Sequence, residues 1–500
     1  MSLDLDRPTP VEAATRRRRI RTWAIALILL ALAVYWLVFA NEYVVAHDDD
    51  GAHFLHGSIG SETTGLPTQV LLALPAMYPE RTGGQDLSRF GLLYAEGDDL
   101  PIGFSRRVID GVERGWFNCA LCHVGAYKMP GDDTRRLILG APSNKLKLQE
   151  LIQFLVDVGR DPGFTADALI EAINSDEVPG HLNPVERLVY RTIAFPQIKA
   201  GLGLVGEQLA FIERQQPWGP GRVDTFNPYK AIQFGFPMTP ETLDPVALDG
   251  ASDYPSLWMQ APREGMNLHW DGNNPSVVER NLSAALGAGV TPVTVDRPAI
   301  ARIEGWMRDL PPPAWPGPVD EALAQQGAGV FADHCAACHG MGGPEGYDYS
   351  TDRHPALGQV VPLDEIGTDP GRWASYTPDF SAAQNTLYAG YPWRFSHFRK
   401  TDGYANHPLD GIWARSPYLH NGAVPTLADL LEPAEARPRI WWRGHEELDL
   451  DRVGYRSSVP GPDLFRYDTA APGNSNAGHD YGTALPAAEK AALVEYMKTL

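Results

Sequence analysis

The chain contains the stretches Cys119-Ala-Leu-Cys122-His123 and Cys335-Ala-Ala-Cys338-His339, which share one spacing and use all four cysteines of the 500 residues. The pattern C-x-x-C-H is the attachment signature of c-type haem, in which both thiols bond to the porphyrin and the histidine ligates the iron. A thioredoxin-like redox pair or a four-cysteine zinc site would also use C-x-x-C, but neither requires a histidine after each second cysteine. The motifs therefore predict two covalently bound c-type haems, attached through Cys119, Cys122, Cys335 and Cys338 and ligated by His123 and His339.

The composition is that of a globular protein with much irregular structure. Hydrophobic residues make up 44% and charged residues 21%, so general disorder is excluded. The formal net charge of −20 argues against nucleic acid as a partner, because a phosphate backbone requires a basic surface. The 49 glycines and 43 prolines predict long loop-rich segments between the regular elements.

The N-terminus has the pattern of a membrane anchor. Residues 1–22 are polar and rich in arginine, and residues 23–40 (WAIALILLALAVYWLVFA) carry no charge. A helix of that length spans about 27 Å, close to a bilayer core, and arginine-rich flanks stay cytoplasmic. We expect a cytoplasmic tail over 1–22, a transmembrane helix over 23–40 in a bacterial inner membrane, and the remaining chain in the periplasm. The alternative is a cleaved signal, with a weak site near Val44-Val45-Ala46, that releases the protein.

The next part of the chain is expected to form an N-terminal haem domain over 91–310. Residues 41–90 show no clear helical pattern and are expected to form an extended periplasmic lead-in. Apolar periodicity predicts helices over 144–159 and 165–173, and a closing helix with an apolar stripe from Ile300 to Leu310.

A proline-rich linker at 311–318 separates this region from a C-terminal haem domain over 319–500. A helix over 321–331 leads into Cys335, and the stripe over 486–500 predicts a helix that closes the domain, as in small cytochromes c. The expected fold class is therefore mainly α, with two cytochrome c-like domains, long loop-rich inserts and one preceding transmembrane helix.

The residue opposite each motif histidine decides what the iron can do. An iron with two strong protein ligands transfers electrons, whereas an open position can bind dioxygen or peroxide. His479, in a loop rich in glycine and asparagine before the closing helix, is the best second ligand for the C-terminal haem; the alternative is a hydrogen bond to a propionate or the backbone. No residue stands out for the N-terminal haem, since isolated methionines such as Met238 more often belong to cores. This weakly favours an open site.

Two further segments occur in the order found in a known superfamily. His269-Trp-Asp-Gly-Asn-Asn-Pro-Ser-Val-Val-Glu279 and Arg415-Ser-Pro-Tyr-Leu-His-Asn-Gly-Ala-Val-Pro-Thr-Leu427 resemble segments of the bacterial di-haem cytochrome c peroxidases. That superfamily includes the di-haem rubber oxygenases, and the loop before His479 and the long inserts look closer to that branch.

The resemblance implies roles for individual residues. Trp270 would lie near the inter-haem region, Glu279 would be an acid/base on the distal side of the N-terminal haem, and His479 would be the second ligand of the C-terminal haem. From the residues alone, Trp270 could equally pack in a core and Glu279 could be a solvated carboxylate at a helix start. Asn273 stands where the peroxidase segment usually has arginine, which puts ordinary peroxidase activity in doubt. The superfamily also allows an interdomain calcium ion, but no ligand cluster in this sequence specifies one.

Three functions are compatible with these features. The favoured one is an oxidoreductase with peroxide or dioxygen chemistry at the N-terminal haem and electron transfer through the C-terminal haem. The alternative is a pure electron-transfer cytochrome with both irons six-coordinate, and a gas sensor is disfavoured because no output domain follows. An acidic surface suits a small basic redox partner, a cytochrome or a cupredoxin.

Overall fold

The computed structural model describes residues 10–38 and 42–500, and 42% of it is helical. The strands form one four-stranded sheet and several two-stranded sheets within these residues. The expectation of a mainly α fold is therefore wrong. The physical reason is the glycine and proline content, because segments interrupted this often cannot continue as helices and instead pair as short antiparallel strands.

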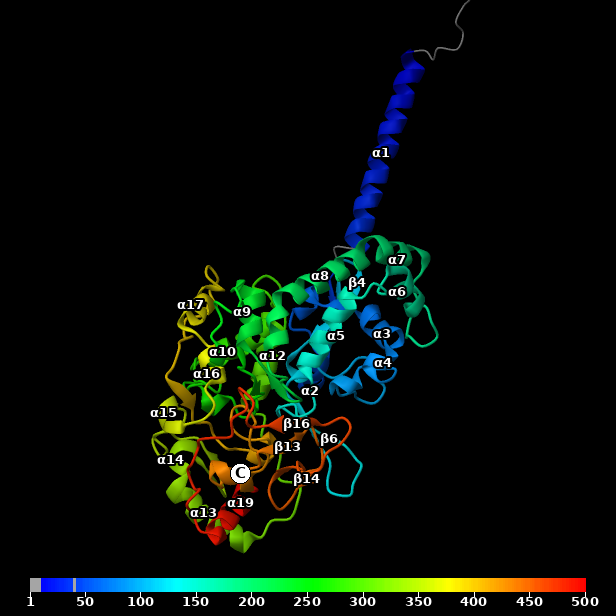
Figure 1. Cartoon of the computed structure of the whole chain (residues 1–500). Helices are drawn as coiled ribbons and strands as arrows, with labels where there is room; N and C mark the ends of the chain where they lie inside the picture. Colours follow the sequence, from blue (N-terminus) through cyan, green and yellow to red (C-terminus); the bar gives the residue numbers. More distant parts are fainter. Residues whose placement is uncertain (1–9, 39–41) are drawn as a thin grey trace, which may run out of the picture.

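Helix α1 (Pro10–Val38) projects from the body of the protein (Figure 1). Its first part carries the arginine cluster, and its later part carries the apolar run. No helix among the described residues is both long and apolar enough to cross a membrane. The predicted transmembrane helix over 23–40 and the single-pass inner-membrane location are therefore wrong; residues 1–9 and 39–40 of the predicted tail and anchor lie outside the described residues.

The segment 42–90 is folded rather than extended. Phe54 on α2 and Val70, Leu71 and Leu74 on α3 are buried in the cores of the N-terminal half. The sequence pattern was weak here because these helices are short. The elements of this segment are β1 (Tyr43–Val44), α2 (Asp50–His56), β2 (Leu66–Pro67), α3 (Thr68–Met77) and α4 (Pro79–Thr82).

A β-hairpin leads into the first haem-attachment motif. Strands β3 (Phe104–Ile109) and β4 (Val112–Phe117) pair antiparallel across a two-residue turn at Asp110 and Gly111, both with positive φ. Asn118 then caps the short 3₁₀ helix η3 (Cys119–Leu121) and donates to the carbonyls of Phe54 and Gly57. Strands β5 (Val124–Tyr127) and β6 (Arg136–Leu139) follow the motif. The first motif is thus positioned by strands, not by a preceding helix as in a small cytochrome.

The N-terminal half also contains the predicted amphipathic helices. Helices α5 (Leu148–Arg160) and α6 (Ala166–Ile173) confirm the helices expected over 144–159 and 165–173, and α12 (Arg297–Arg308) confirms the closing helix. On α5, Leu151, Phe154, Leu155 and Val158 form the buried stripe. The other elements of this half are α7 (Pro184–Val189), the π-helical turn η4 (Tyr190–Ala194), α8 (Phe195–Gln208), β7 (Arg222–Val223), α9 (Phe226–Phe234), α10 (Pro245–Leu248), β8 (Ser252–Asp253) and α11 (Val277–Gly287).

The C-terminal half is framed by two crossing helices, as the sequence predicts. Helix α13 (Glu321–His334) leads through α14 (Ala336–His339) into the second motif, and α19 (Ala487–Met497) packs across α13 (Figure 1). The rings of Phe331 and Tyr496 meet at 5.1 Å between their centroids. The remaining elements are β9 (Met341–Gly343), β10 (Gly346–Asp348), β11 (Val360–Pro362), α15 (Leu363–Ile366), α16 (Gly371–Ser375), α17 (Pro378–Thr386), β12 (Gly403–Ala405), α18 (Leu427–Leu430), β13 (Ile440–Arg443), β14 (Leu448–Asp449), β15 (Gly454–Tyr455) and β16 (Phe465–Asp468).

The two halves share their hydrophobic cores. One buried cluster joins Phe226 and Tyr229 of α9 to Tyr376 and Phe380 from the second half. Another joins Trp258 to Phe331 and Leu493 of the crossing helices. Residues 311–318 carry no regular element and separate the halves along the chain, but the halves interlock in space.

Gly327 on α13 tests the helix crossing. A Cβ at this position would lie 1.9 Å from the carbonyl oxygen of Ala492, so the helices would have to separate. We expect Gly327→Ala to lower the free energy of unfolding by about 1–3 kcal/mol, the usual cost of overpacking. Gly329, on the same helix, has open space at its Cβ position, so Gly329→Ala should be stabilising by up to about 1 kcal/mol. Denaturant titration of both variants measures the difference, and equal effects would contradict the crossing.

Candidate haem-binding sites

The first motif histidine is oriented by a main-chain carbonyl. Nδ1 of His123 donates a hydrogen bond to the carbonyl oxygen of Pro255 over 2.9 Å. Desolvation lowers the pKa of His123 to about 4, so the ring is neutral at physiological pH. With the proton on Nδ1, the lone pair of Nε2 is available to a metal, which is the usual arrangement of a ligating histidine.

The second motif repeats this arrangement. Nδ1 of His339 donates to the carbonyl oxygen of His407 over 2.8 Å, and desolvation again lowers the pKa of the imidazole. His407 lies 68 residues further along the chain. Each motif histidine is therefore held in the same tautomer by a segment far from it in sequence.

His479 faces His339 at the separation expected for two ligands of one iron. The ring centroids are 6.2 Å apart. With metal–nitrogen bonds of about 2 Å and each ring centre about 1 Å behind its nitrogen, two rings on opposite sides of one metal lie about 6 Å apart. Desolvation, followed by the neighbouring His339, lowers the pKa of His479 to about 4. The residues present therefore fit a six-coordinate haem iron between His339 and His479.

The loop that carries His479 is anchored at several points. The backbone N–H of His479 donates to the carbonyl of Ile366. The guanidinium of Arg437 donates to the carbonyl of Gly478 over 2.9 Å, and the side-chain amide of Asn421 donates to the carbonyl of Ser475, also over 2.9 Å. Gly478 has φ of +76°, and a Cβ there would lie 2.3 Å from the backbone of Gly367, so only glycine fits this close approach.

The cysteines lack the environment of redox thiols. Desolvation raises the pKa of Cys119 to about 11, of Cys122 to about 12 and of Cys335 to about 11, and it also raises the pKa of Cys338. Reactive thiols have depressed pKa values instead. This geometry disfavours a thioredoxin-like function for either pair.

Positive charge is buried around His407 without matching negative charge. Arg263 and Arg415 share the carboxylate of Asp410. Arg280 is 8% exposed and has no carboxylate within ion-pair distance in the described part of the chain; desolvation, followed by the charge of Arg263, lowers its pKa to about 10. Buried cations are costly unless paired. Haem propionates would supply the missing anions by pairing with arginine, which is a second way in which these residues fit the cofactor.

Trp270 lies between the segments that hold the two motif histidines. Its indole Nε1 donates to the carbonyl of Asp253 over 2.8 Å, and its ring meets the ring of His407 edge-on with 5.7 Å between centroids. Trp270 therefore contacts both of these segments, while its location between two haems stays a prediction. Its catalytic role stays a prediction.

Glu279 is held by many hydrogen-bond donors. Its carboxylate accepts from the side chains of Asn274 and His397 and from the backbone of Ser396 and His397. Desolvation raises its pKa, but these hydrogen bonds outweigh it and leave the pKa lowered. The carboxylate is therefore ionised and anchors residues 396–397, an arrangement that disfavours the predicted acid/base role.

Several supporting residues gave no signal in the sequence. His407, Arg280, Asn421 and Arg437 each act through contacts with segments distant in the chain. Of these four, Asn421 lies in the segment 415–427, which resembles a segment of the peroxidase superfamily, but the resemblance gave Asn421 no role. Three-dimensional contact, which no local pattern encodes, was needed to find the others.

Comparison with known proteins agrees with this geometry. Residues 403–442 match a family model described as RoxA-like, cytochrome c-like. The match supports c-type haem, the rubber-oxygenase-like branch of cytochromes, and an oxidoreductase or electron-transfer role. It contains His407, Asn421 and Arg437, which support His339 and the His479 loop. The match does not show that the chain belongs to the wider superfamily of di-haem peroxidases.

Two proteins of Sinorhizobium fredii (strain NBRC 101917 / NGR234) are similar to the chain. The protein y4iJ is 27% identical over 97% of this chain and 100% of its own length. The protein y4iM is 32% identical over 46% of this chain and 57% of its own length. Similarity to y4iJ therefore extends through both halves.

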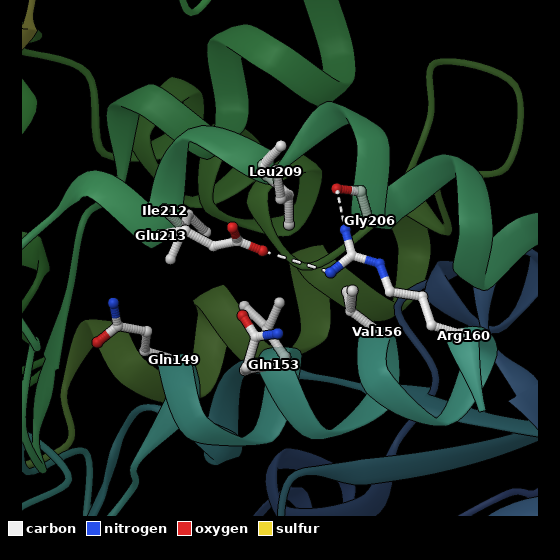
Figure 2. A pocket seen from close by; sticks show the side chains of 10 residues that line it. Gln149, Gln153, Val156, Arg160, Gly206, Leu209, Ile212 and Glu213 are labelled. Atoms are coloured by element: carbon white, nitrogen blue, oxygen red, sulfur yellow. Dashed lines mark hydrogen bonds and ion pairs between the residues drawn. The ribbon is translucent and has the colours of Figure 1, made fainter.

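A separate pocket lies between α5 and α8 (Figure 2). Gln149 and Gln153 of α5 and Leu209 beyond α8 line it, and Arg160 closes one end through an ion pair with Glu213 of 3.3 Å. None of the cysteines or candidate ligand histidines lines this pocket. It therefore belongs to neither candidate haem site.

The ligand role of His479 can be tested by substitution. We expect His479→Ala to convert one low-spin ferric signal in the electron paramagnetic resonance (EPR) spectrum to a high-spin signal, because the second imidazole is lost. His445, in the same half and hydrogen-bonded to the carbonyl of Val459, provides the control His445→Ala, which should leave the spectrum unchanged. An unchanged spectrum for His479→Ala would remove this residue as a ligand.

Proposed function

We propose that the protein is a di-haem c-type oxidoreductase in which the two haem sites have different tasks. The observation that carries the proposal is an asymmetry between the motifs. His339 faces a second imidazole at 6.2 Å, whereas the ring contact of His123 in the described chain is with Tyr254, at 6.1 Å and edge-on. Burial, followed by the neighbouring thiol of Cys122, raises the pKa of Tyr254, so this ring belongs to the attachment side.

A c-type haem with one protein ligand supplies an iron that can bind dioxygen or peroxide, and one with two ligands supplies an electron carrier. At the C-terminal site, His339 and His479 would both ligate the haem iron, and Arg437 and Asn421 keep the His479 loop in place. At the N-terminal site, His123 would be the ligand that the described residues supply. The proposal therefore assigns chemistry to the N-terminal site and electron storage or transfer to the C-terminal site.

The surroundings of the first motif favour an apolar substrate or a small gas. Cys119 packs against a buried cluster rich in aromatic side chains, including Phe226, Tyr229, Tyr376 and Phe380. Such a cluster excludes water and offers few hydrogen-bond donors to a charged substrate. The net charge of −20 suits a basic redox partner, for which we propose a small cytochrome or cupredoxin.

The ferric EPR spectrum tests the asymmetry. We expect one high-spin and one low-spin haem in equal amounts, and only the high-spin signal should respond to added hydrogen peroxide. Two low-spin signals that ignore peroxide would instead establish the electron-transfer cytochrome with both irons six-coordinate. Denaturing gels stained for covalent haem show whether the protein carries the cofactor, so that a missing EPR signal is not mistaken for either result.

A further inference from the structure

The supports of the two motif histidines are physically connected. His123 donates to the carbonyl of Pro255, and Trp270 donates to the carbonyl of Asp253, two residues earlier on the same segment. His339 donates to the carbonyl of His407, whose ring contacts the ring of Trp270. Trp270 therefore touches both segments that orient the candidate proximal ligands.

The side chain of His407 completes this connection. Its Nε2 donates to the carbonyl of His269 over 3.0 Å, and His269 directly precedes Trp270. His269 has φ of +63°, an uncommon conformation for a residue with a Cβ, and its Nδ1 is 2.6 Å from Oδ1 of Asn273. The hydrogen bond from His407 thus fixes the backbone at the start of the Trp270 segment.

We propose that His407 is a positioning residue that couples the two haem sites. Its carbonyl orients His339, while its imidazole holds Trp270 against the segment that orients His123. A change at one proximal histidine is thereby transmitted to the other through hydrogen bonds and one ring contact. This inference rests on the proposed di-haem function and assigns to His407 a role that the haem-attachment motifs do not contain.

Two substitutions of His407 test whether its side chain positions the Trp270 segment through a hydrogen bond or only fills space. His407→Leu removes the Nε2 donor and the ring contact with Trp270 but retains an apolar side chain. His407→Gln keeps an N–H donor that can reach the carbonyl of His269. His354, a buried histidine of the same half with Nε2 3.2 Å from Asp348, provides the control His354→Leu.

We expect His407→Leu to shift the g values of the low-spin haem and to raise its reduction potential. The carbonyl that accepts from His339 is then less firmly placed, and a weaker hydrogen bond makes the imidazole a weaker donor to ferric iron. The high-spin signal of the N-terminal haem should shift as well, because Trp270 is released. His407→Gln should restore both signals towards those of the unaltered protein, and His354→Leu should change neither.

A shift confined to the C-terminal haem would overturn the coupling, and unchanged signals at both haems would overturn the positioning role altogether. If the proposed function itself is wrong, the EPR spectrum of the unaltered protein already differs from the expectation, because it lacks one high-spin and one low-spin haem signal. Haem staining and circular dichroism of each variant identify any loss of attachment or folding. If His407→Leu loses its haem or its fold, His407→Gln decides the question. Signals of both haems close to those of the unaltered protein would support the proposal, and signals shifted as strongly as after loss of the donor would overturn it.

Discussion

The hydrogen bond from Nδ1 of each motif histidine to a distant carbonyl is the constraint on which both sites depend. It selects one tautomer, directs Nε2 away from the protein backbone and ties a local motif to a segment far away in the chain. His123 depends on Pro255, and His339 depends on His407. The long glycine- and proline-rich segments are therefore part of the cofactor sites, because they carry the acceptors that a short cytochrome c motif lacks.

Burial of charge explains why these sites need a cofactor to be complete. The charges of Arg263, Arg280 and Arg415 all act on the buried ring of His407, and the carboxylate of Asp410 pairs with Arg263 and Arg415. Among the described residues, Nε of Arg415 has no hydrogen-bond partner. A protein that kept this arrangement without an anion would carry a large desolvation cost. Haem propionates would balance the charge, so binding of haem and folding of the interface between the halves are expected to stabilise each other.

Sequence patterns predicted the parts of the fold that are locally encoded. The spacing around Cys119 and Cys335 indicated the attachment sites, and apolar periodicity predicted α5, α12, α13 and α19, because a buried stripe repeats within one helix. The hairpin before Cys119, the packing of residues 42–90 and the interlocked cores were not predictable in this way, since they depend on pairing between distant segments. The apolar run after Trp23 was overinterpreted as a membrane-spanning helix. The loop around His479 predicted it as a ligand, and this role stays a prediction, whereas His407 and Arg280 had no local signature.

Covalent attachment of two haems is the central claim, and the mass of the intact polypeptide tests it most directly. We expect the mass of the chain plus two haems, and the loss of one haem when Cys119 and Cys122, or Cys335 and Cys338, are both replaced by serine. A denatured polypeptide with the mass of the bare chain, from cells that attach c-type haem to a control cytochrome, would contradict the account.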